Sequence, residues 1–516
     1  MRHIWTAGTA LGALAIVCTA PAQAQEVTST IRGTVTAGDA PVAGAAVTVT
    51  HVPSGTTSTT QTGADGSFSA SGLRAGGPFT VTVSASGYPD ASVTGLQLTA
   101  GQPLRLPIEL AEAGQEIVVT GSNSRATELS SGPISSFSRE KIEGVASISR
   151  DIRDIARRDP FATLDPTNSR AVLIAGQNGR LNRFSVDGQR FSDNFGLNNG
   201  GLPTARGPVP LDAIEQFSVK IAPYDVTEGD FQGGAINVIL RSGGNRLTGS
   251  GFYTYTDDGL TGDRTRGSTT NPSGRVALNY KSKNFGGFLS GPIIKDTLFF
   301  ALSYERLEET TPVSFGLAGY PNVVPNLTEA QLGQVSAIAQ SRYGYDTMGL
   351  LGSFKEVDEK YTAKLDWNIT DGQRLAATYI HNEGTVGSDP GFSTVSPTSP
   401  ALSYASNLYY RPETVDSGTL QLNSDWSDDF HSELRANYRE YDLLPSALGA
   451  TTLGQVQVCL DPTSVGARPP VRKGRARLPG RRGSISGPIN SARPTSSRPR
   501  ATASMPCCAG NMAAIA

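Results

Sequence analysis

Few side chains in this sequence are spaced for covalent chemistry. Neither the metalloprotease pattern H-E-x-x-H nor the hydrolase pattern G-x-S-x-G occurs. Ser138 and Lys141 match S-x-x-K, but a serine in front of a short helical stretch favours a helix N-cap. Residues 176–179 (Gly-Gln-Asn-Gly) favour a turn, because no strand–Gly–helix pattern surrounds them. The four histidines are scattered along the chain: His3, His51, His381 and His431. We therefore expect no catalysis, no cofactor and no metal site.

Cysteine use and net charge exclude further classes of protein. Three cysteines follow the first 24 residues, all near the C-terminal end: Cys459, Cys507 and Cys508. No histidine follows His431, so zinc-finger spacing is absent, and the main body is neither a disulfide scaffold nor a thiol enzyme. The 516 residues carry a formal net charge of −2, so we expect no nucleic-acid partner. With 58 glycines, the composition favours many short strands and turns.

Residues 1–24 have the pattern of a signal peptide for export. A basic start (Arg2 and His3) leads to an apolar run at 11–17 and a small-residue A-x-A cleavage site at 22–24. Cys18 leaves a lipoprotein alternative open. The residue before it, Val17, is too bulky for a typical lipobox and argues against that alternative. No later stretch reaches the roughly 20 apolar residues of a transmembrane helix, so any membrane span is expected to be a β-barrel.

Residues 27–111 predict a small β-sandwich. The runs at 46–50 and 79–83 are rich in β-branched residues and alternate between apolar and polar positions. Turn signals such as Asp65-Gly66 separate them. About seven short strands fit in this length, which is typical of a sandwich.

The same segment carries a recognisable motif. Ile31–Val35, Pro41–Ala45 and Asp65–Phe68, followed by Gly87-Tyr88, resemble the carboxypeptidase regulatory-like domain. The resemblance implies a transthyretin/Ig-like sandwich without peptidase activity. By fold analogy alone it also implies a link to carbohydrate-binding sandwiches.

A β-branched stretch at 115–122 lies between polar flanks. One interpretation is a further short strand. Its position between the sandwich and the next domain makes it resemble a TonB box, which implies an unpaired strand that adds to a sheet edge of TonB. The residues expected to make this contact are Glu116, Ile117, Val118, Val119 and Thr120.

Residues 130–243 mix helical and strand patterns. Three isoleucines at helical spacing predict a helix over 147–158, which Pro160 ends. Strand-like runs follow up to Leu240. Several motifs here resemble the plug of Oar-type TonB-dependent receptors and imply an α+β plug domain: Arg183–Gly188, Asp193–Leu197, Pro210–Gln216, Ala222–Val226 and Gly233–Val238.

From 246 to 460 apolar and polar residues alternate, which places them on opposite faces of strands. Tight turns near 293–296, 370–372 and 427–429 alternate with long connections, a rhythm typical of transmembrane barrels. The long connections are expected at about 305–358 and 385–412. Aromatic residues near strand ends are typical of interfacial girdles: Trp367, Tyr379, Trp426, Phe430 and Tyr438.

Seven strands are expected in this region, near 246–257, 274–291, 297–307, 358–369, 373–384, 413–426 and 430–441. The segments Gly286–Asp296 and Leu298–Glu305 resemble the early barrel of the same Oar-like receptors. Because barrels of that type close with 22 strands, the resemblance implies a partial antiparallel transmembrane β-barrel, about a third of the wall.

Residues 461–516 lose the alternation abruptly. No acidic residue follows Asp461, and arginine, proline, glycine and serine are frequent. Three interpretations stay open: a basic tail for anionic lipid or nucleic acid, a disordered linker, and an out-of-frame or truncated end. The abruptness of the change favours the third, which would make the chain a C-terminally truncated or frameshifted fragment.

These patterns together predict a mainly β protein. The resemblance implies a TonB-dependent receptor of the cell outer membrane for energised uptake, and we expect no enzyme. The resemblance implies TonB, with its inner-membrane energising complex, as partner. Outer-membrane lipid and an extracellular substrate of unknown identity (chelated iron, carbohydrate or peptide) are the other expected partners. The alternative is a secreted or surface carbohydrate-binding or adhesive β-protein. An enzymatic hypothesis rests only on the name of the regulatory-like domain.

Overall fold

The computed structural model describes most of the chain between residues 27 and 460 and three short segments beyond it. The described residues are 27–111, 117–120, 126–129, 132–147, 149–165, 168–193, 198, 200–221, 232–260, 262–264, 266, 274, 280–389, 393–396, 400–427, 430–451, 454–460, 484–486, 504–507 and 510–513. The expected signal peptide, Glu116 and most of the segment 461–516 lie outside the described residues.

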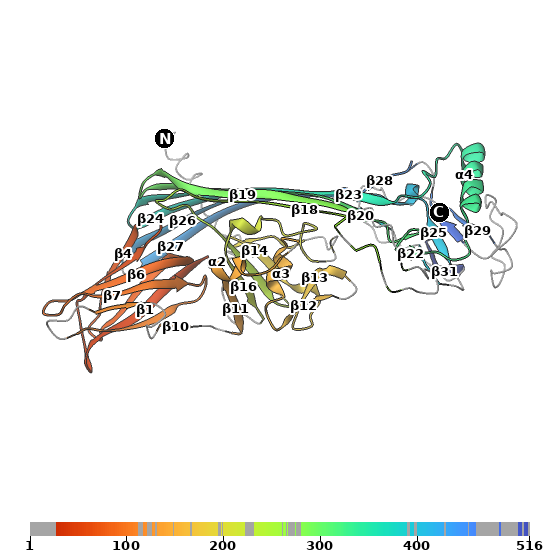
Figure 1. Ribbon diagram of the computed structural model, residues 1–516. Coiled ribbons are helices and arrows are strands. Elements are labelled where there is room, and N and C mark those ends of the chain that lie inside the picture. The colour runs from red at the N-terminus through yellow and green to blue at the C-terminus, as the bar shows by residue number, and fades with distance from the viewer. Residues whose placement is uncertain are drawn as a thin grey trace, which may run out of the picture.

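The N-terminal unit is a sandwich of two five-stranded sheets. Its strands are β1 (Thr28–Ala37), β2 (Ala40–Pro41), β3 (Ala46–His51), β4 (Thr56–Gln61), β5 (Ser67–Arg74), β6 (Gly76–Ser84), β7 (Ala91–Leu98), β8 (Leu104–Glu109), β9 (Ile117–Thr120) and β10 (Thr127–Glu128). One sheet has the order β10-β8-β1-β2 with β5 also on β1, and the other has the order β4-β3-β6-β7-β9. The sandwich lies at one end of the molecule (Figure 1).

Alternation along the strands forms the core of this sandwich. Val47 and Val49 of β3 and Val81 and Val83 of β6 are buried, while the threonines between them are only partly buried. The turn before β5 requires glycine: Gly66 has a φ of +73°, and a Cβ there would lie 2.6 Å from the carbonyl oxygen of Val35.

An α/β domain follows the sandwich. Its elements are β11 (Ile134–Ser138), α2 (Arg139–Glu143), α3 (Ile152–Ala156), β12 (Ala162–Asp165), β13 (Asn168–Ile174), η2 (Gly179–Leu181), β14 (Arg183–Val186), β15 (Gln189–Arg190), η3 (Leu211–Ala213), β16 (Ile214–Lys220) and β17 (Ala235–Leu240). Its main sheet has the order β11-β16-β17-β14-β15, with β14 parallel to β17. The turn expected at 176–179 lies slightly earlier: the Gln177 N–H donates to the Ile174 carbonyl oxygen at 3.0 Å, and Gly179 begins η2. Ser138 is the N-cap of α2, although its side chain makes no capping hydrogen bond.

The helix expected over 147–158 is much shorter in the structure. It begins only at Ile152, because Arg150 adopts a left-handed φ of 50° and Asp151 is extended and caps the helix by accepting a hydrogen bond from the Arg153 N–H. The expectation failed because spacing alone does not report that local break.

A long antiparallel sheet covers the α/β domain (Figure 1). Its strands are β18 (Thr248–Asp257), β19 (Lys281–Ile294), β20 (Leu298–Pro312), β23 (Ser353–Thr370), β24 (Gln373–Ser388), β26 (Tyr409–Ser427) and β27 (Phe430–Leu443), and β28 (Ser446–Ala447) pairs with the start of β26. Each of the seven strands pairs with the next in chain order, so all seven expected barrel strands are present. Within the described residues β18 and β27 are its two edges, and the sheet is open.

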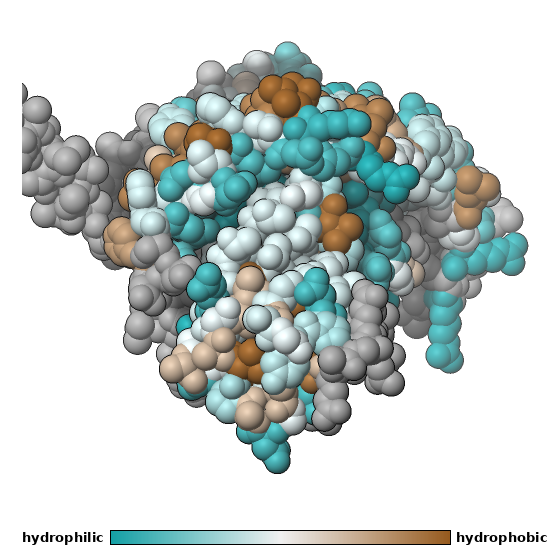
Figure 2. Space-filling view, turned by 90° about the vertical axis from the view of Figure 1, so that its left-hand side faces the viewer, coloured by the Kyte–Doolittle hydropathy of each residue, from teal (hydrophilic) through white to brown (hydrophobic). Residues whose placement is uncertain are grey.

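The two faces of this long sheet differ in composition. The inner face packs on the α/β domain, and its Ile380 and Val415 join the core of that domain. The outer face leaves large apolar side chains exposed: Leu289, Leu302, Tyr361, Leu365, Trp367, Tyr379, Leu420, Trp426, Phe430, Leu434 and Tyr438. Figure 2 looks onto the sandwich end, and hydrophobic residues gather along its upper rim, where Figure 1 places the long sheet.

The long connections fold into a lobe at the end of the sheet opposite the sandwich (Figure 1). It contains β21 (Phe315–Gly316), β22 (Asn322–Val323), α4 (Glu329–Tyr343), β25 (Ala401–Ser403), η4 (Ala405–Asn407) and β29 (Gln457–Cys459). Two further short strands pair with each other, β31 (Ser504–Cys507) and β32 (Gly510–Ala513), and β30 (Ser484–Ser486) lies between β25 and β29. The sequence had indicated only loops where α4 forms.

Candidate functional site

The strand expected to bind a partner is paired in the structure. β9, residues 117–120, runs parallel to β7, with Ile117 opposite Ala91 and Thr120 opposite Thr94. This differs from the unpaired segment that the sequence predicted. β9 is nevertheless the last strand of its sheet, so its other edge has no strand partner among the described residues.

A two-residue turn between β14 and β15 fastens the α/β domain to the long sheet. Asp187 and Gly188 both adopt positive φ, 43° and 73°. The Asp187 carboxylate accepts hydrogen bonds from the Leu240 backbone N–H at 2.8 Å and from the Lys364 ammonium at 2.9 Å. Both charged side chains are about nine-tenths buried. The sequence placed Asp187 in a motif that resembles a plug but did not indicate its ion pair.

The residue after this turn reaches the neighbouring strands of the sheet. The Gln189 side-chain oxygen accepts hydrogen bonds from the hydroxyls of Ser417 and, at 2.8 Å, Thr419. Its amide donates to the Tyr438 carbonyl oxygen at 3.1 Å. Glycine is favoured at Gly188 by its φ of +73°, which L side chains rarely adopt.

Charged pairs continue this interface toward the lobe. Arg206 of the α/β domain forms an ion pair with Glu309 at 3.0 Å. The Lys360 ammonium, fully buried, donates to the Gly207 carbonyl oxygen at 3.0 Å and lies 2.9 Å from Asp358. The face of the long sheet that is charged in sequence therefore encloses a polar domain instead of facing bulk water.

The sandwich contacts the opposite end of the same sheet, where the tight turns lie. Asn245 donates from its backbone N–H to the Pro53 carbonyl oxygen at 2.7 Å, and the Asn368 amide donates to the Thr56 hydroxyl at 3.1 Å. The Ala100 N–H donates to the side-chain oxygen of Gln216 in the α/β domain at 3.0 Å.

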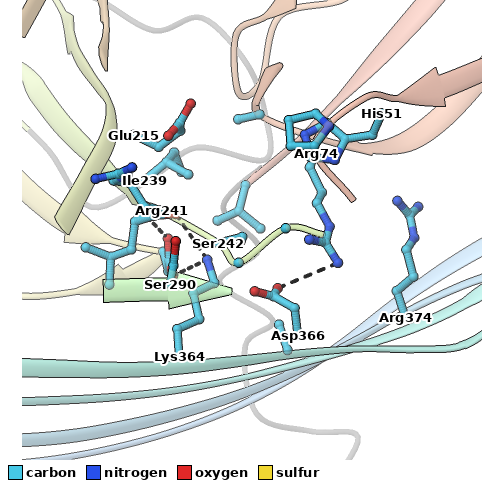
Figure 3. Close-up of a pocket in the computed structure, with 18 of the residues that line it drawn as sticks. His51, Arg74, Glu215, Ile239, Arg241, Ser242, Ser290, Lys364, Asp366 and Arg374 are labelled. Carbon is cyan, nitrogen blue, oxygen red and sulfur yellow. Dashed lines mark hydrogen bonds and ion pairs between the residues drawn. The ribbon is translucent and has the colours of Figure 1, made fainter. Parts of the chain in front are cut away.

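A cavity of about 590 Å³ lies where these three units meet (Figure 3). We call it the junction cavity. Its polar lining comes from the sandwich (His51 and Arg74), from the α/β domain and the segment after it (Asp187, Glu215, Arg241 and Arg246) and from the long sheet (Lys364, Asp366 and Arg374).

Burial sets the charge state of two groups on this lining. It lowers the pKa of His51 to about 3, an effect that Arg74 and Arg374 strengthen by charge repulsion. Burial also raises the pKa of Glu215, against the opposing attraction of Arg241 and Arg139. His51 is therefore neutral at ordinary pH.

No group of three or more metal-ligating side chains gathers within the described residues. In that same part of the chain, no helix is long and apolar enough to cross a membrane. The described residues hold the α/β domain against the long sheet by polar contacts and leave a cavity where both meet the sandwich.

Two known protein families match the sandwich and the first part of the long sheet. The family described as "Carboxypeptidase regulatory-like domain" matches residues 30–111, and the family described as "Outer membrane beta barrel domain" matches residues 239–349. These matches confirm the sandwich resemblance and the outer-membrane location.

One curated relative and two solved structures illustrate the similarity. The TonB-dependent transporter Oar of Myxococcus xanthus is 28% identical over 251 residues, which are 45% of this chain and 23% of that protein. The outer membrane transporter YddB of Escherichia coli has a TM-score of 0.41 at 13% identity, covering 60% of this chain and 39% of that one. A mutant of the ferric enterobactin receptor of Pseudomonas aeruginosa has a TM-score of 0.41 at 16% identity, covering 64% and 43%.

The chain thus spans about a quarter of the length of the curated relative. Its sandwich matches the carboxypeptidase regulatory-like family, its residues 239–349 match the outer membrane beta barrel family, and 251 of its residues are similar in sequence to the TonB-dependent transporter Oar.

Proposed function

We propose that the protein takes part in TonB-dependent uptake across the outer membrane, with the α/β domain as the plug of the barrel. One observation carries this proposal: the charged face of the long sheet encloses a polar domain while its apolar face is exposed. Leu302, Leu365 and Leu420 are each nearly half exposed on the outer face, where lipid would cover them.

A mobile plug needs an interface that can be released. The contacts of Asp187 and Gln189 with the sheet are hydrogen bonds and an ion pair, and they lie beside the apolar contacts of Ile380 and Val415 with the core of the α/β domain. Polar groups that leave each other can be rehydrated as water enters the lumen. Such an interface is suited to rearrangement under an applied force.

The proposed partner is TonB, which draws its energy from the inner membrane. The contact would be made by Glu116 to Thr120, through strand addition along the outer edge of β9 or in place of β7. The substrate, an iron chelate, a carbohydrate or a peptide, would first meet the lobe built from the long connections. The protein itself would perform no covalent chemistry.

The partner strand is tested in an intact relative, at the position that corresponds to Val118. Proline there removes a backbone donor, so Val118→Pro, like deletion of residues 116–120, should abolish energised uptake while surface binding of substrate persists. The matched control is Ser58→Pro in β4, the strand at the other edge of the same sheet. Unchanged uptake in the Val118→Pro variant would refute the assignment, and equal loss in the control would assign the effect to the sandwich fold instead.

A further inference from the structure

The lining of the junction cavity has a cationic surplus. Five cationic side chains (Arg74, Arg241, Arg246, Lys364 and Arg374) face three carboxylates (Asp187, Glu215 and Asp366). Lys364 is neutralised by Asp187 at 2.9 Å, and the Arg241 guanidinium lies 3.7 Å from the centroid of the Phe288 ring. Arg74 and Arg374 make only longer ion pairs, with Asp366 at 3.8 Å and with Asp425 at 3.7 Å.

These two arginines come from different units and extend into the same space (Figure 3). Arg74, at the end of β5, donates from Nη2 to the Asn368 side-chain oxygen at 3.2 Å. Arg374, in β24, donates from Nη2 to the Gly72 carbonyl oxygen. Arg74 Nη1 and Arg374 Nε are buried and make no hydrogen bond. Arg374 is only 8% exposed, so its unsatisfied donor is costly without a ligand.

The nearest carboxylates do not satisfy these guanidinium groups. Asp366 lies 3.8 Å from Arg74, and Asp425 lies 3.7 Å from Arg374. Charge-assisted hydrogen bonds between nitrogen and oxygen are typically about 2.7–2.9 Å. One oxygen of Asp366 is also buried without a hydrogen-bond partner. The site therefore has two cationic groups, each with one buried donor that makes no hydrogen bond and one carboxylate beyond hydrogen-bond distance.

The low pKa of His51 indicates the sign of the electrostatic potential in the junction cavity. After burial, the two largest causes of its low pKa are the charges of Arg74 and Arg374. Because both arginines oppose protonation of His51, the potential at that wall of the cavity is positive, and a bound anion would experience it as attraction.

We propose that the junction cavity binds an organic oxyanion, whose phosphate or carboxylate group lies between Arg74 and Arg374. The volume of the junction cavity, about 590 Å³, falls within the roughly 300–1,000 Å³ of small-molecule pockets. The rest of the ligand would lie against the apolar part of the lining, which includes Val52, Ile239 and Leu375. Because the ligand touches the sandwich and the long sheet at once, it favours their docked arrangement by mass action.

The test uses the full chain in detergent, with inorganic phosphate as the probe in isothermal titration. Arg74→Gln and Arg374→Gln should each weaken phosphate binding at least tenfold, about 1.4 kcal/mol. Asp366→Asn should strengthen binding several-fold, because it removes the acidic neighbour. Arg32→Gln, an exposed arginine of β1 in the same sandwich, should leave the affinity unchanged.

A second arm separates a free anion from a lipid headgroup. The thermal midpoint of the chain is measured in phosphatidylcholine nanodiscs with and without phosphatidylglycerol. A rise with phosphatidylglycerol that Arg74→Gln removes assigns the oxyanion to a phospholipid, and a rise with phosphate alone assigns it to a soluble ligand. The proposal is overturned if the folded, unmodified chain responds to neither probe, or if Arg32→Gln loses as much affinity as Arg74→Gln. It also fails if Asp366→Asn, which keeps both arginines, binds phosphate more weakly.

Discussion

The buried ion pair between Asp187 and Lys364 stabilises the docking of the α/β domain on the long sheet. Asp187→Ala should destabilise the protein by about 3–5 kcal/mol, because Lys364 then remains buried without a counter-charge. The double variant Asp187→Ala, Lys364→Met should recover part of that loss, since no unpaired charge is left, although the Leu240 N–H still lacks its acceptor. Denaturant unfolding of the parent, Asp187→Ala, Lys364→Met and the double variant in detergent measures the coupling as a double-mutant cycle. Additive losses would show that the pair does not act as a unit.

The low pKa of buried His51 predicts that the sandwich loses stability in acid. The folded-state pKa of His51, about 3, lies below the roughly 6.5 of an unfolded histidine. Between these two pH values the unfolded chain binds a proton that the folded chain does not bind. The contribution of neutral His51 to the free energy of unfolding is fully present above about pH 6.5 and decreases as the pH falls toward 3. Between pH 7 and pH 5 the expected loss is about 2 kcal/mol.

The measurement compares unfolding of the parent and of His51→Gln at several pH values. The variant should lose this part of the pH dependence, whereas the control His431→Gln should keep it. An identical pH slope in parent and His51→Gln would contradict the assignment.

At the scale of the element, each strand of the long sheet has one face for lipid and one for the enclosed domain. Leu302→Arg, in the middle of β20 on the outer face, should destabilise the protein in lipid vesicles by about 2–4 kcal/mol. Leu444→Arg is the control, because Leu444 is more exposed but lies just beyond the end of β27. Equal effects of the two substitutions would argue against a lipid-covered face.

At the scale of the whole molecule, the apolar outer face of the long sheet requires a membrane or a surfactant, while its open edges are unfavourable in either solvent. An unpaired strand edge in hydrocarbon leaves backbone groups unsatisfied, and in water it promotes aggregation. We expect the chain in the outer-membrane fraction, and we expect heat-modifiable electrophoretic migration of an intact relative. A monodisperse protein in plain buffer would instead favour a secreted carbohydrate-binding or adhesive protein.

The sequence by itself determined the strands of the sandwich and of the long sheet. Alternation with a period of two is a local property, and tight turns such as 370–372 are encoded by a few adjacent residues. All seven barrel strands could therefore be located, with differences mainly at their ends. The capping residues Thr328 and Gly344 were also readable and could have indicated α4, which the sequence analysis missed.

Only the tertiary structure decided how these elements meet. Arg374 and Gly72 are 302 positions apart, and Lys364 and Asp187 are 177 apart, so no local pattern reports their contacts. The pairing of β9 with β7 likewise depends on where the chain returns after the sandwich has formed. Periodicity tells which face of a strand is charged. It does not tell which charges become buried partners, because that depends on the packing of segments that are distant in sequence.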